Sequence, residues 1–305
     1  MADDAFFLGG VKPMSLYKYL AHERFDVLQN GRIRFSQHMA LNDPFEMKPF
    51  FDGVASDVFL AQFFNASWQA YGDDALKLID GLIPEALKDE HYRSVIAQSK
   101  SENPAADLLL DTHRAKMPEI RNVIFTSFND GVGALCLTEE RDNLIMWAHY
   151  ANNYKGFVIE FDDNHEFFHE KDSQMGELGH VRQVNYSQDR PNHVSFTDLS
   201  AAEIFFLKCE EWSYEKEWRM LKRLPSDQAD EIKRDADGQP IYLFSFPPES
   251  VIAIVLGSRM PLEVQNKFSE FLSTDRRYSS VKLYRAILDE KKFQLRIEPI
   301  EAGQS

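Results

Sequence analysis

Apolar and polar residues follow two different periods along the chain. Short runs rich in branched and aromatic side chains, several of them alternating with polar residues, are typical of strands. They lie mostly in the second half of the sequence. The predicted strands span residues 32–36, 123–128, 134–138, 157–161, 179–186, 217–222, 241–246, 251–256, 282–286 and 294–300.

Helical spacing, with apolar residues three and four positions apart, dominates elsewhere. It predicts a helix over 15–29, where Leu16, Tyr19 and Leu20 share one side, and a helical insertion over 54–121. Further helices are predicted over residues 143–151, 199–210 and 262–272.

The order of these elements predicts the fold class. Short strands separated by loops, with helices grouped together, favour an α+β fold over a regular strand–helix alternation. We therefore predict a mixed, mainly antiparallel sheet core in a single domain spanning residues 1–305. Residues 1–14 are predicted to form an N-terminal arm, and the insertion over 54–121 lies within the domain.

Composition and charge narrow the protein class. The 305 residues are 44% hydrophobic and carry a formal charge of -15. An acidic surface disfavours a broad platform for nucleic acid or anionic membranes. Cys136 and Cys209 are too few for a disulfide framework. The first ten residues lack a secretory signal, and no apolar run reaches the ~20 residues of a membrane helix, so we expect a cytoplasmic protein without membrane contact.

Common catalytic motifs are absent or lack their context. His165, Glu166 and His169 fit the H-E-x-x-H pattern of zinc proteases, but no third ligand pattern follows and the segment comes directly after a predicted strand. We therefore expect a helix-capping segment there and no metal. The sequence contains no P-loop, no G-x-G-x-x-G and no G-x-S-x-G.

Four short strings combine aromatic and charged residues: LYKY at 16–19, NDPFE at 42–46, MWAHYANNYKGF at 146–157 and WSYEKEWR at 212–219. Aromatic residues favour burial and charges oppose it unless paired, so such mixtures are typical of pocket walls. The strings are far apart, so the fold must bring them together. The candidate binding residues in and near them are Tyr17, Lys18, Arg34, Ser36, Asn42, Asp43, Trp147, Tyr150, Tyr154 and Arg219.

Three residues are candidate catalysts. If 212–219 is extended, Glu215, Glu217 and Arg219 share one face of the strand. Two like carboxylates beside one arginine can have one pKa raised and the other lowered, as acid–base catalysis requires. The alternative is a salt-bridged edge strand. His149 is the third candidate, and its alternative is a structural histidine.

Taken together, these strings resemble the large bacterial family of domain of unknown function 2971. The features that carry the resemblance are LYKY, NDPFE, the block DNLIMWAHYANNYKGFVIEFD and WSYEKEWR. The resemblance covers roughly residues 15–260, apart from the helical stretch near 55–120. The family name itself implies no activity.

The order of the strings is also similar to that of ADP-ribosyltransferase-like domains, which split NAD at the nicotinamide–ribose bond. The positions that this similarity implies are, in chain order, Tyr17 or Lys18, then Ser36 or Tyr150, then Glu217. It implies NAD as substrate, with aromatic walls around the nicotinamide and Lys18, Arg34 or Arg219 on the phosphates.

The resulting functional hypothesis is a cytoplasmic, NAD-using ADP-ribosyltransferase-like enzyme or NAD glycohydrolase, acting as a toxin or anti-phage effector. Its acceptor is a protein or nucleic acid, and an antitoxin or other partner protein accompanies it. A rival hypothesis is a non-catalytic sensor whose cavity takes a nucleotide, another small ligand or a partner loop. A third is a metal-dependent nuclease or hydrolase using His149 with Glu217 or Asp162.

Overall fold

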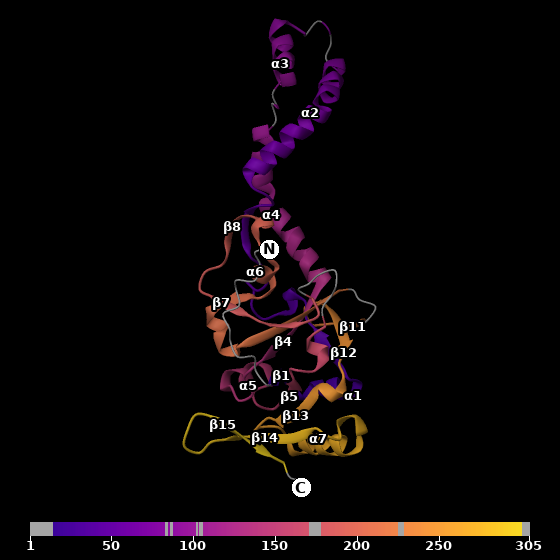
Figure 1. Ribbon diagram of the computed structural model, residues 1–305, viewed down its shortest axis with the longest axis vertical. Coiled ribbons are helices and arrows are strands. Elements are labelled where there is room, and N and C mark those ends of the chain that lie inside the picture. The colour runs from indigo at the N-terminus through magenta and orange to yellow at the C-terminus, as the bar shows by residue number, and fades with distance from the viewer. Residues whose placement is uncertain are drawn as a thin grey trace. The chain divides into compact units, whose positions relative to one another are not determined.

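A large mixed sheet forms the centre of the fold. The computed structural model describes residues 15–82, 85, 88–101, 103, 106–170, 178–224 and 229–300, so the arm predicted over 1–14 lies outside the described residues. Within them, one sheet has the strand order β15-β14-β13-β5-β1-β4-β10-β6 (Figure 1). Its strands are β1 (Ser15–Leu20), β4 (Val132–Thr138), β5 (Phe157–Asp162), β6 (Val181–Gln183), β10 (Glu217–Arg223), β13 (Val251–Leu256), β14 (Lys282–Leu288) and β15 (Leu295–Pro299).

Neighbouring strands of this sheet run antiparallel, except that β13 and β14 are parallel. Helix α7 (Leu262–Thr274) connects these two, as a parallel pair requires a crossover. Smaller sheets are β11 (Ala229–Arg234) with β12 (Pro240–Ser245) and β2 (Arg32–Phe35), β3 (Phe50–Gly53) with β8 (Asn192–Ser195), and β7 (Asn185–Ser187) with β9 (Leu207–Cys209). The predicted α+β class with a mixed, mainly antiparallel sheet is confirmed.

The chain divides into two compact units. The first, here called the sheet unit, comprises the described residues within Met1–Met47, Ser127–Asp189 and Phe205–Ser305. The second, the helical unit, comprises those within Lys48–Thr126 and Arg190–Ile204. The remaining helices are α1 (Asp26–Asn30), α2 (Asp57–Leu82), α3 (Glu90–Ser101), α4 (Ala106–Gly131), α5 (Leu144–Tyr150) and α6 (Ala201–Phe205).

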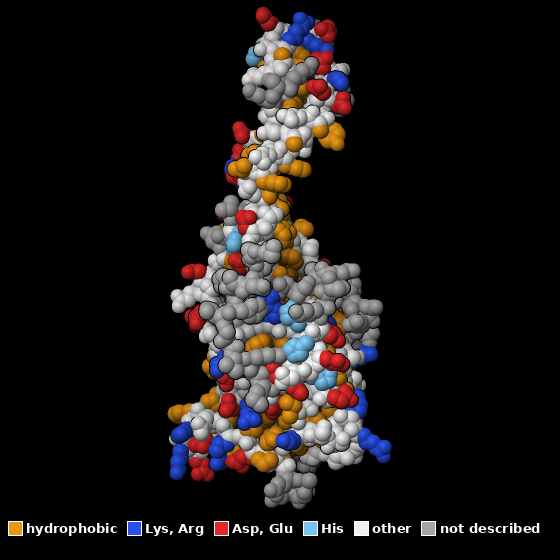
Figure 2. Space-filling view, in the orientation of Figure 1, with side chains coloured by type: hydrophobic (Ala, Val, Ile, Leu, Met, Phe, Trp, Pro, Cys, Tyr) orange, Lys and Arg blue, Asp and Glu red, His pale blue; other side chains and the backbone are white. Residues whose placement is uncertain are grey.

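The helical unit carries many exposed apolar side chains (Figure 2). They are Phe50, Val58, Phe59, Phe63, Tyr71, Val95, Leu108, Leu109 and Val123. No helix in the described part of the chain is both long enough and apolar enough to cross a membrane.

The helix predicted over 15–29 is wrong in its first half, which forms β1. Leu16 and Leu20 are four residues apart, and that spacing fits one face of a strand as well as one face of a helix. Pairing with β4 on one side and β5 on the other places β1 inside the sheet. Only the following residues turn, in the 3-10 helix η1 (His22–Phe25) and α1.

The strand predicted over 123–128 is also wrong, since these residues lie in α4. A short apolar run cannot be assigned from period alone, and here a long helix contains it. The helix predicted over 199–210 is limited to α6 and is followed by β9. The strand predicted over 179–186 divides into β6 and β7.

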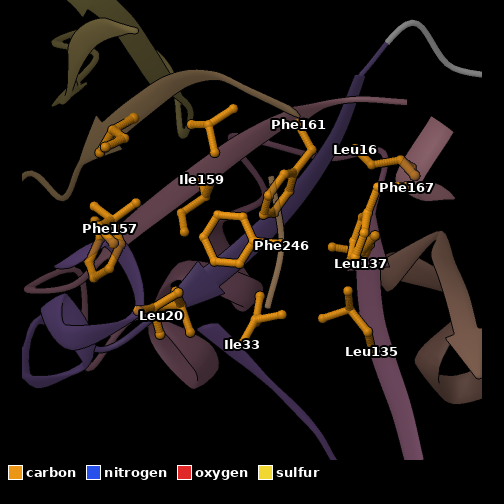
Figure 3. Packing of buried hydrophobic residues seen from close by; sticks show 14 of the residues in the cluster. Leu16, Leu20, Ile33, Leu135, Leu137, Phe157, Ile159, Phe161, Phe167 and Phe246 are labelled. Atoms are coloured by element: carbon orange, nitrogen blue, oxygen red, sulfur yellow. The ribbon is translucent and has the colours of Figure 1, made fainter. Parts of the chain in front are cut away.

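Strand pleating separates a hydrophobic face from a polar one in the sheet unit. Leu16 on β1, Leu137 on β4 and Phe161 on β5 belong to the main core cluster (Figure 3). The intervening positions point to the opposite face. There the register pairs Tyr17 with Thr138 and Thr138 with Glu217, so three central strands place one row of side chains side by side.

Candidate functional site

A cavity of about 210 Å³ opens on the polar face of the sheet unit. Three separate regions of sequence supply its walls: the β1–β2 region with the following loop, the β4–α5 region, and the segment from β9 to β10. The lining residues are Tyr17, Lys18, Tyr19, Ser36, Ala40, Leu41, Asn42, Glu46, Cys136, Leu137, Thr138, Met146, Tyr150, Lys208, Glu215 and Glu217. Each of the four aromatic and charged strings therefore reaches one shared cavity.

Helix α5 positions Tyr150 at the cavity. Its N-cap is Asn143, whose side chain accepts hydrogen bonds from the backbone N–H groups of Ile145 and Met146. The Asn143 amide also donates to the carbonyl of Tyr214 at 3.0 Å. One side chain thus fixes the start of α5 to the segment that carries the glutamates.

The turn after α5 needs unusual backbone conformations. Asn152, Asn153 and Tyr154 all have positive φ angles. A Cβ at Gly156 would lie 2.1 Å from the carbonyl oxygen of Leu20, so only glycine allows this approach to β1. The turn therefore holds α5 close to the strand that carries Tyr17 and Tyr19.

Lys208 joins the two candidate catalytic carboxylates. Its Nζ donates to Glu215 Oε2 at 2.7 Å and to Glu217 Oε2 at 3.0 Å, and the Lys208 side chain is only 3% exposed. Burial disfavours the ammonium, but Glu217 and Glu215 outweigh this effect and raise the pKa of Lys208. Lys208 therefore stays a cation inside the cluster.

Arg219 holds Glu217 from the other side. Arg219 Nε donates to Glu217 Oε1 at 2.6 Å and its Nη2 donates to Glu217 Oε2 at 3.0 Å, a two-point carboxylate contact. Arg219 also forms an ion pair with Glu46 and donates to the carbonyl of Phe205. Burial raises the pKa of Glu217 above that of an ordinary glutamate, although Lys208 opposes the shift. Both oxygens of Glu217 are therefore fully engaged.

Glu215 is held differently and lies next to an aromatic hydroxyl. Tyr150 donates to Glu215 Oε1 at 2.5 Å, and the Asn42 side-chain amide donates to the Tyr150 oxygen at 2.8 Å. Burial and the Glu215 carboxylate both raise the pKa of Tyr150, so the phenol remains protonated. The Glu215 carbonyl accepts from Thr138 Oγ1, which ties this segment to β4.

Residues 212–219 are not extended throughout, which was the condition for Glu215, Glu217 and Arg219 to share one face of a strand. Glu215 ends the 3-10 helix η6 (Glu210–Glu215), and β10 begins only at Glu217. Lys216 between them has a left-handed φ of 40°. Both carboxylates nevertheless accept hydrogen bonds from Lys208, so Glu215 and Glu217 lie side by side although they do not share one strand.

The β1 side of the cavity adds a cation and two phenols. Lys18 Nζ donates to the carbonyl of Cys136 at 2.8 Å, and burial lowers the pKa of Lys18. The Tyr17 hydroxyl donates to Glu160 at 3.4 Å, and the Tyr19 hydroxyl donates to the carbonyl of Glu140 at 2.8 Å. Burial and nearby Glu217 raise the pKa of the Cys136 thiol well above its usual value, which disfavours the nucleophilic thiolate.

Several predicted binding residues lie outside the cavity lining. Trp147 and Tyr154 stack with each other behind the wall, with ring centroids 6.4 Å apart, and Trp147 meets Tyr19 edge-on. Arg34 pairs with Asp235 at 2.7 Å. Asp43 is buried.

The Asp43 side chain accepts from the backbone N–H of Phe45, as expected for a turn. Arg219 lies behind Glu217 and has no exposed surface. Of the thirteen predicted site residues, the cavity is lined by Tyr17, Lys18, Ser36, Asn42, Tyr150, Glu215 and Glu217.

His149 and the H-E-x-x-H segment have ordinary surroundings. His149 is exposed and contacts the edge of the Tyr150 ring. His165 caps the 3-10 helix η4 (Glu166–Phe168) by accepting from Phe167 N–H, as predicted for a capping segment. The His169 ring lies 2.7 Å from the carbonyl of Asp163. Among the described residues, no group of three His, Cys, Asp or Glu side chains is arranged to hold a metal ion.

Lys208 is a site residue that sequence reasoning missed. It sits in the run FFLKCEEW, where one lysine among apolar and acidic neighbours has no distinguishing pattern. Its role arises because β9 and η6 bring it against Glu215 and Glu217. Glu46 is not among the candidate binding residues named from the sequence, although it is the charged member of NDPFE that lines the cavity.

The comparison with protein-family models gives a match for part of the chain. Neither the curated proteins nor the solved structures contain a match to the chain. Residues 146–220 match the family model described as "Protein of unknown function (DUF2971)". This segment includes α5 from Met146 onward, Lys208 and both candidate catalytic glutamates. The resemblance to the family of domain of unknown function 2971, predicted from the aromatic strings, is thereby confirmed.

Proposed function

We propose that the cavity binds the nicotinamide end of NAD and that the protein breaks the nicotinamide–ribose bond, with Glu215 as the catalytic carboxylate. The observation that supports this most is the setting of Glu215. It is a buried carboxylate at a cavity walled by Tyr17, Tyr19 and Tyr150. Tyrosine rings offer flat surfaces for a pyridine ring, and a fixed carboxylate stabilises positive charge that develops beside it.

The chemistry follows from that arrangement. The C–N bond breaks with its electron pair moving to the ring nitrogen, so nicotinamide leaves as a neutral molecule. The ribose carbon gains positive charge, as in sugar hydrolysis, and a nearby carboxylate lowers the energy of that state. The oxygen of water or of an acceptor hydroxyl then bonds to this carbon and loses its proton to the carboxylate or to solvent.

Glu215 suits this role better than Glu217, the residue implied by the ADP-ribosyltransferase similarity. Glu217 has both oxygens held by Arg219 and Lys208. Glu215 has one oxygen held by Tyr150, which a ligand hydroxyl can replace, and the other by Lys208. We therefore assign Glu217 to positioning Lys208 and Arg219.

The cavity volume limits what can be enclosed. About 210 Å³ is smaller than the roughly 300–1,000 Å³ of pockets that take a whole small molecule. This supports enclosure of one ring system and its ribose, with the rest of the dinucleotide outside. The cations expected on the phosphates are engaged elsewhere: Lys18 with the Cys136 carbonyl, Arg34 with Asp235, and Arg219 with the glutamates.

The test is release of nicotinamide from NAD, measured by chromatography, with protein and nucleic-acid acceptors added in parallel. We expect Glu215→Gln to reduce the rate by about 100-fold or more. Glu211→Gln is the matched control, because Glu211 is exposed in the same 3-10 helix η6. Tyr150→Phe keeps the aromatic wall and the fold but frees Glu215, and we expect an intermediate rate.

Two results contradict the proposal. One is wild-type protein that releases no nicotinamide with any acceptor. Binding of NAD without product then favours the sensor hypothesis, which is also consistent with the complete pairing of Glu217. The other is a Glu215→Gln variant that is folded and as active as the wild type.

A further inference from the structure

One buried carboxylate oxygen at the cavity has no hydrogen-bond donor. Glu46 lines the cavity, and the residue is only 2% exposed. Its Oε1 pairs with Arg219 and lies 3.7 Å from Lys208 Nζ. Its Oε2 has no donor among the described residues. A buried polar atom without a partner is costly, so this position favours a ligand that supplies one.

Carboxylates outnumber cations among the side chains that line the cavity. Glu46, Glu215 and Glu217 line it beside Lys18 and Lys208, whereas Arg219 lies behind Glu217. Lys208 is shared by Glu215 and Glu217, and Arg219 by Glu217 and Glu46. A lining richer in carboxylates than in cations favours a cationic ligand over an anionic one, because Coulomb interactions are strong in a buried site.

Aromatic rings in the lining also favour a cationic ligand. Tyr17, Tyr19 and Tyr150 line the same cavity, and tyrosine faces attract organic cations. The Tyr19 ring is held edge-on against Trp147 at 5.3 Å, so this wall is fixed before a ligand binds. A flat cation with an N–H group therefore fits this cavity in three ways. It can lie against the tyrosine faces, it is attracted to the carboxylates of the lining, and it can donate a hydrogen bond to Glu46.

We infer that the cavity selects a flat aromatic cation bearing an N–H donor, and that Glu46 is the specificity-determining residue that accepts this donor. The inference rests on the proposed function, because the nicotinamide of NAD is such a ring: it carries a positive charge and a carboxamide. It also adds to that function. Bond cleavage turns the ring neutral, so the cavity holds the product more weakly than the substrate and release follows.

The experiment is calorimetric titration of the whole wild-type protein with three probes. 1-Methylnicotinamide has the cation and the donor, nicotinamide has the donor without the charge, and 1,3-dimethylpyridinium has the charge without the donor. We expect 1-methylnicotinamide to bind about 10-fold more tightly than either of the others. Equal binding of the three within about twofold, or no binding of 1-methylnicotinamide, overturns the inference.

A substitution of Glu46 tests whether this residue accepts the hydrogen bond from the ligand. Glu46→Gln keeps the size of the side chain but removes its charge, so we expect 1-methylnicotinamide to bind about 10-fold more weakly and nicotinamide to change little. Glu211→Gln is again the exposed control, and thermal unfolding checks that Glu46→Gln is folded. A folded Glu46→Gln variant with unchanged selectivity contradicts the role of Glu46.

The outcomes separate this inference from the proposed function. Selective binding of 1-methylnicotinamide by a protein that never cleaves NAD supports the inference and refutes the catalytic proposal. Cleavage of NAD by a protein that binds the three probes equally supports the catalytic proposal and refutes the inference about selectivity.

Discussion

Replacing Lys208 with methionine removes the cation that two buried glutamates share. Lys208 is the donor to Glu215 at 2.7 Å and to Glu217 at 3.0 Å, and these side chains are 3–5% exposed. Methionine preserves most of the apolar stem, so the loss of packing is small. The main effect is electrostatic: breaking a buried ion pair costs about 3–5 kcal/mol because it leaves charge uncompensated.

Urea unfolding at pH 7.5 measures this loss. With a urea dependence of about 2–3 kcal/mol per molar, Lys208→Met is expected to lower the unfolding midpoint by about 1–2 M. Lys267→Met is the matched control. Lys267 lies on α7 with a side chain 61% exposed and pairs across one helical turn with Glu263, so its removal is expected to cost at most about 0.5 kcal/mol.

The pH dependence of the same variant provides a second check. Burial already raises the pKa of Glu217, and loss of Lys208 raises it further. A carboxyl whose folded pKa exceeds its unfolded value is protonated at no cost below the unfolded pKa, and it destabilises the fold as pH rises through the folded value. The deficit of Lys208→Met should therefore shrink from pH 7.5 toward pH 5. A deficit below about 1 kcal/mol, or one that grows on acidification, refutes this reasoning.

Two further substitutions test how α5 is placed. Asn143→Ala removes the acceptor for two backbone N–H groups at the start of α5 and is expected to cost about 0.5–2 kcal/mol of stability, measured by thermal unfolding. A variant that changes nicotinamide release without any loss of stability contradicts the capping role. Gly156→Ala places a Cβ 2.1 Å from the carbonyl oxygen of Leu20 and is expected to cost about 1–3 kcal/mol or more. Gly131→Ala should be neutral, because the added Cβ lies more than 4 Å from every other segment in the described part of the chain. Equal stability of the two glycine variants contradicts the close approach.

Part of the fold could be predicted because local pattern and final environment agree. The branched run FVIEF forms β5, and the alternating EWRMLK forms β10, close to their predicted bounds. β1 could not be predicted in this way. Its leucines fit a helix, and only the strands on both sides, β4 and β5, decide the outcome.

The candidate site was predictable to a similar degree. Tyr17, Tyr150 and the two glutamates were found because each lies in a string of aromatic and charged residues. Lys208 was missed because its partners are set by tertiary pairing and not by its neighbours in sequence. The expectation that Lys18, Arg34 or Arg219 hold phosphates stays a prediction.

The row formed by Tyr17, Thr138 and Glu217 also bears on how the sheet assembles. These residues are more than a hundred positions apart in the first pair and about eighty in the second, so the row forms only after distant segments meet. A slip of one residue between β4 and β10 would turn Glu217 to the hydrophobic face of the sheet, beside Leu135 and Leu137 of β4 and away from Lys208. The charged residues at the cavity therefore also disfavour a misaligned pairing of β4 and β10 during folding.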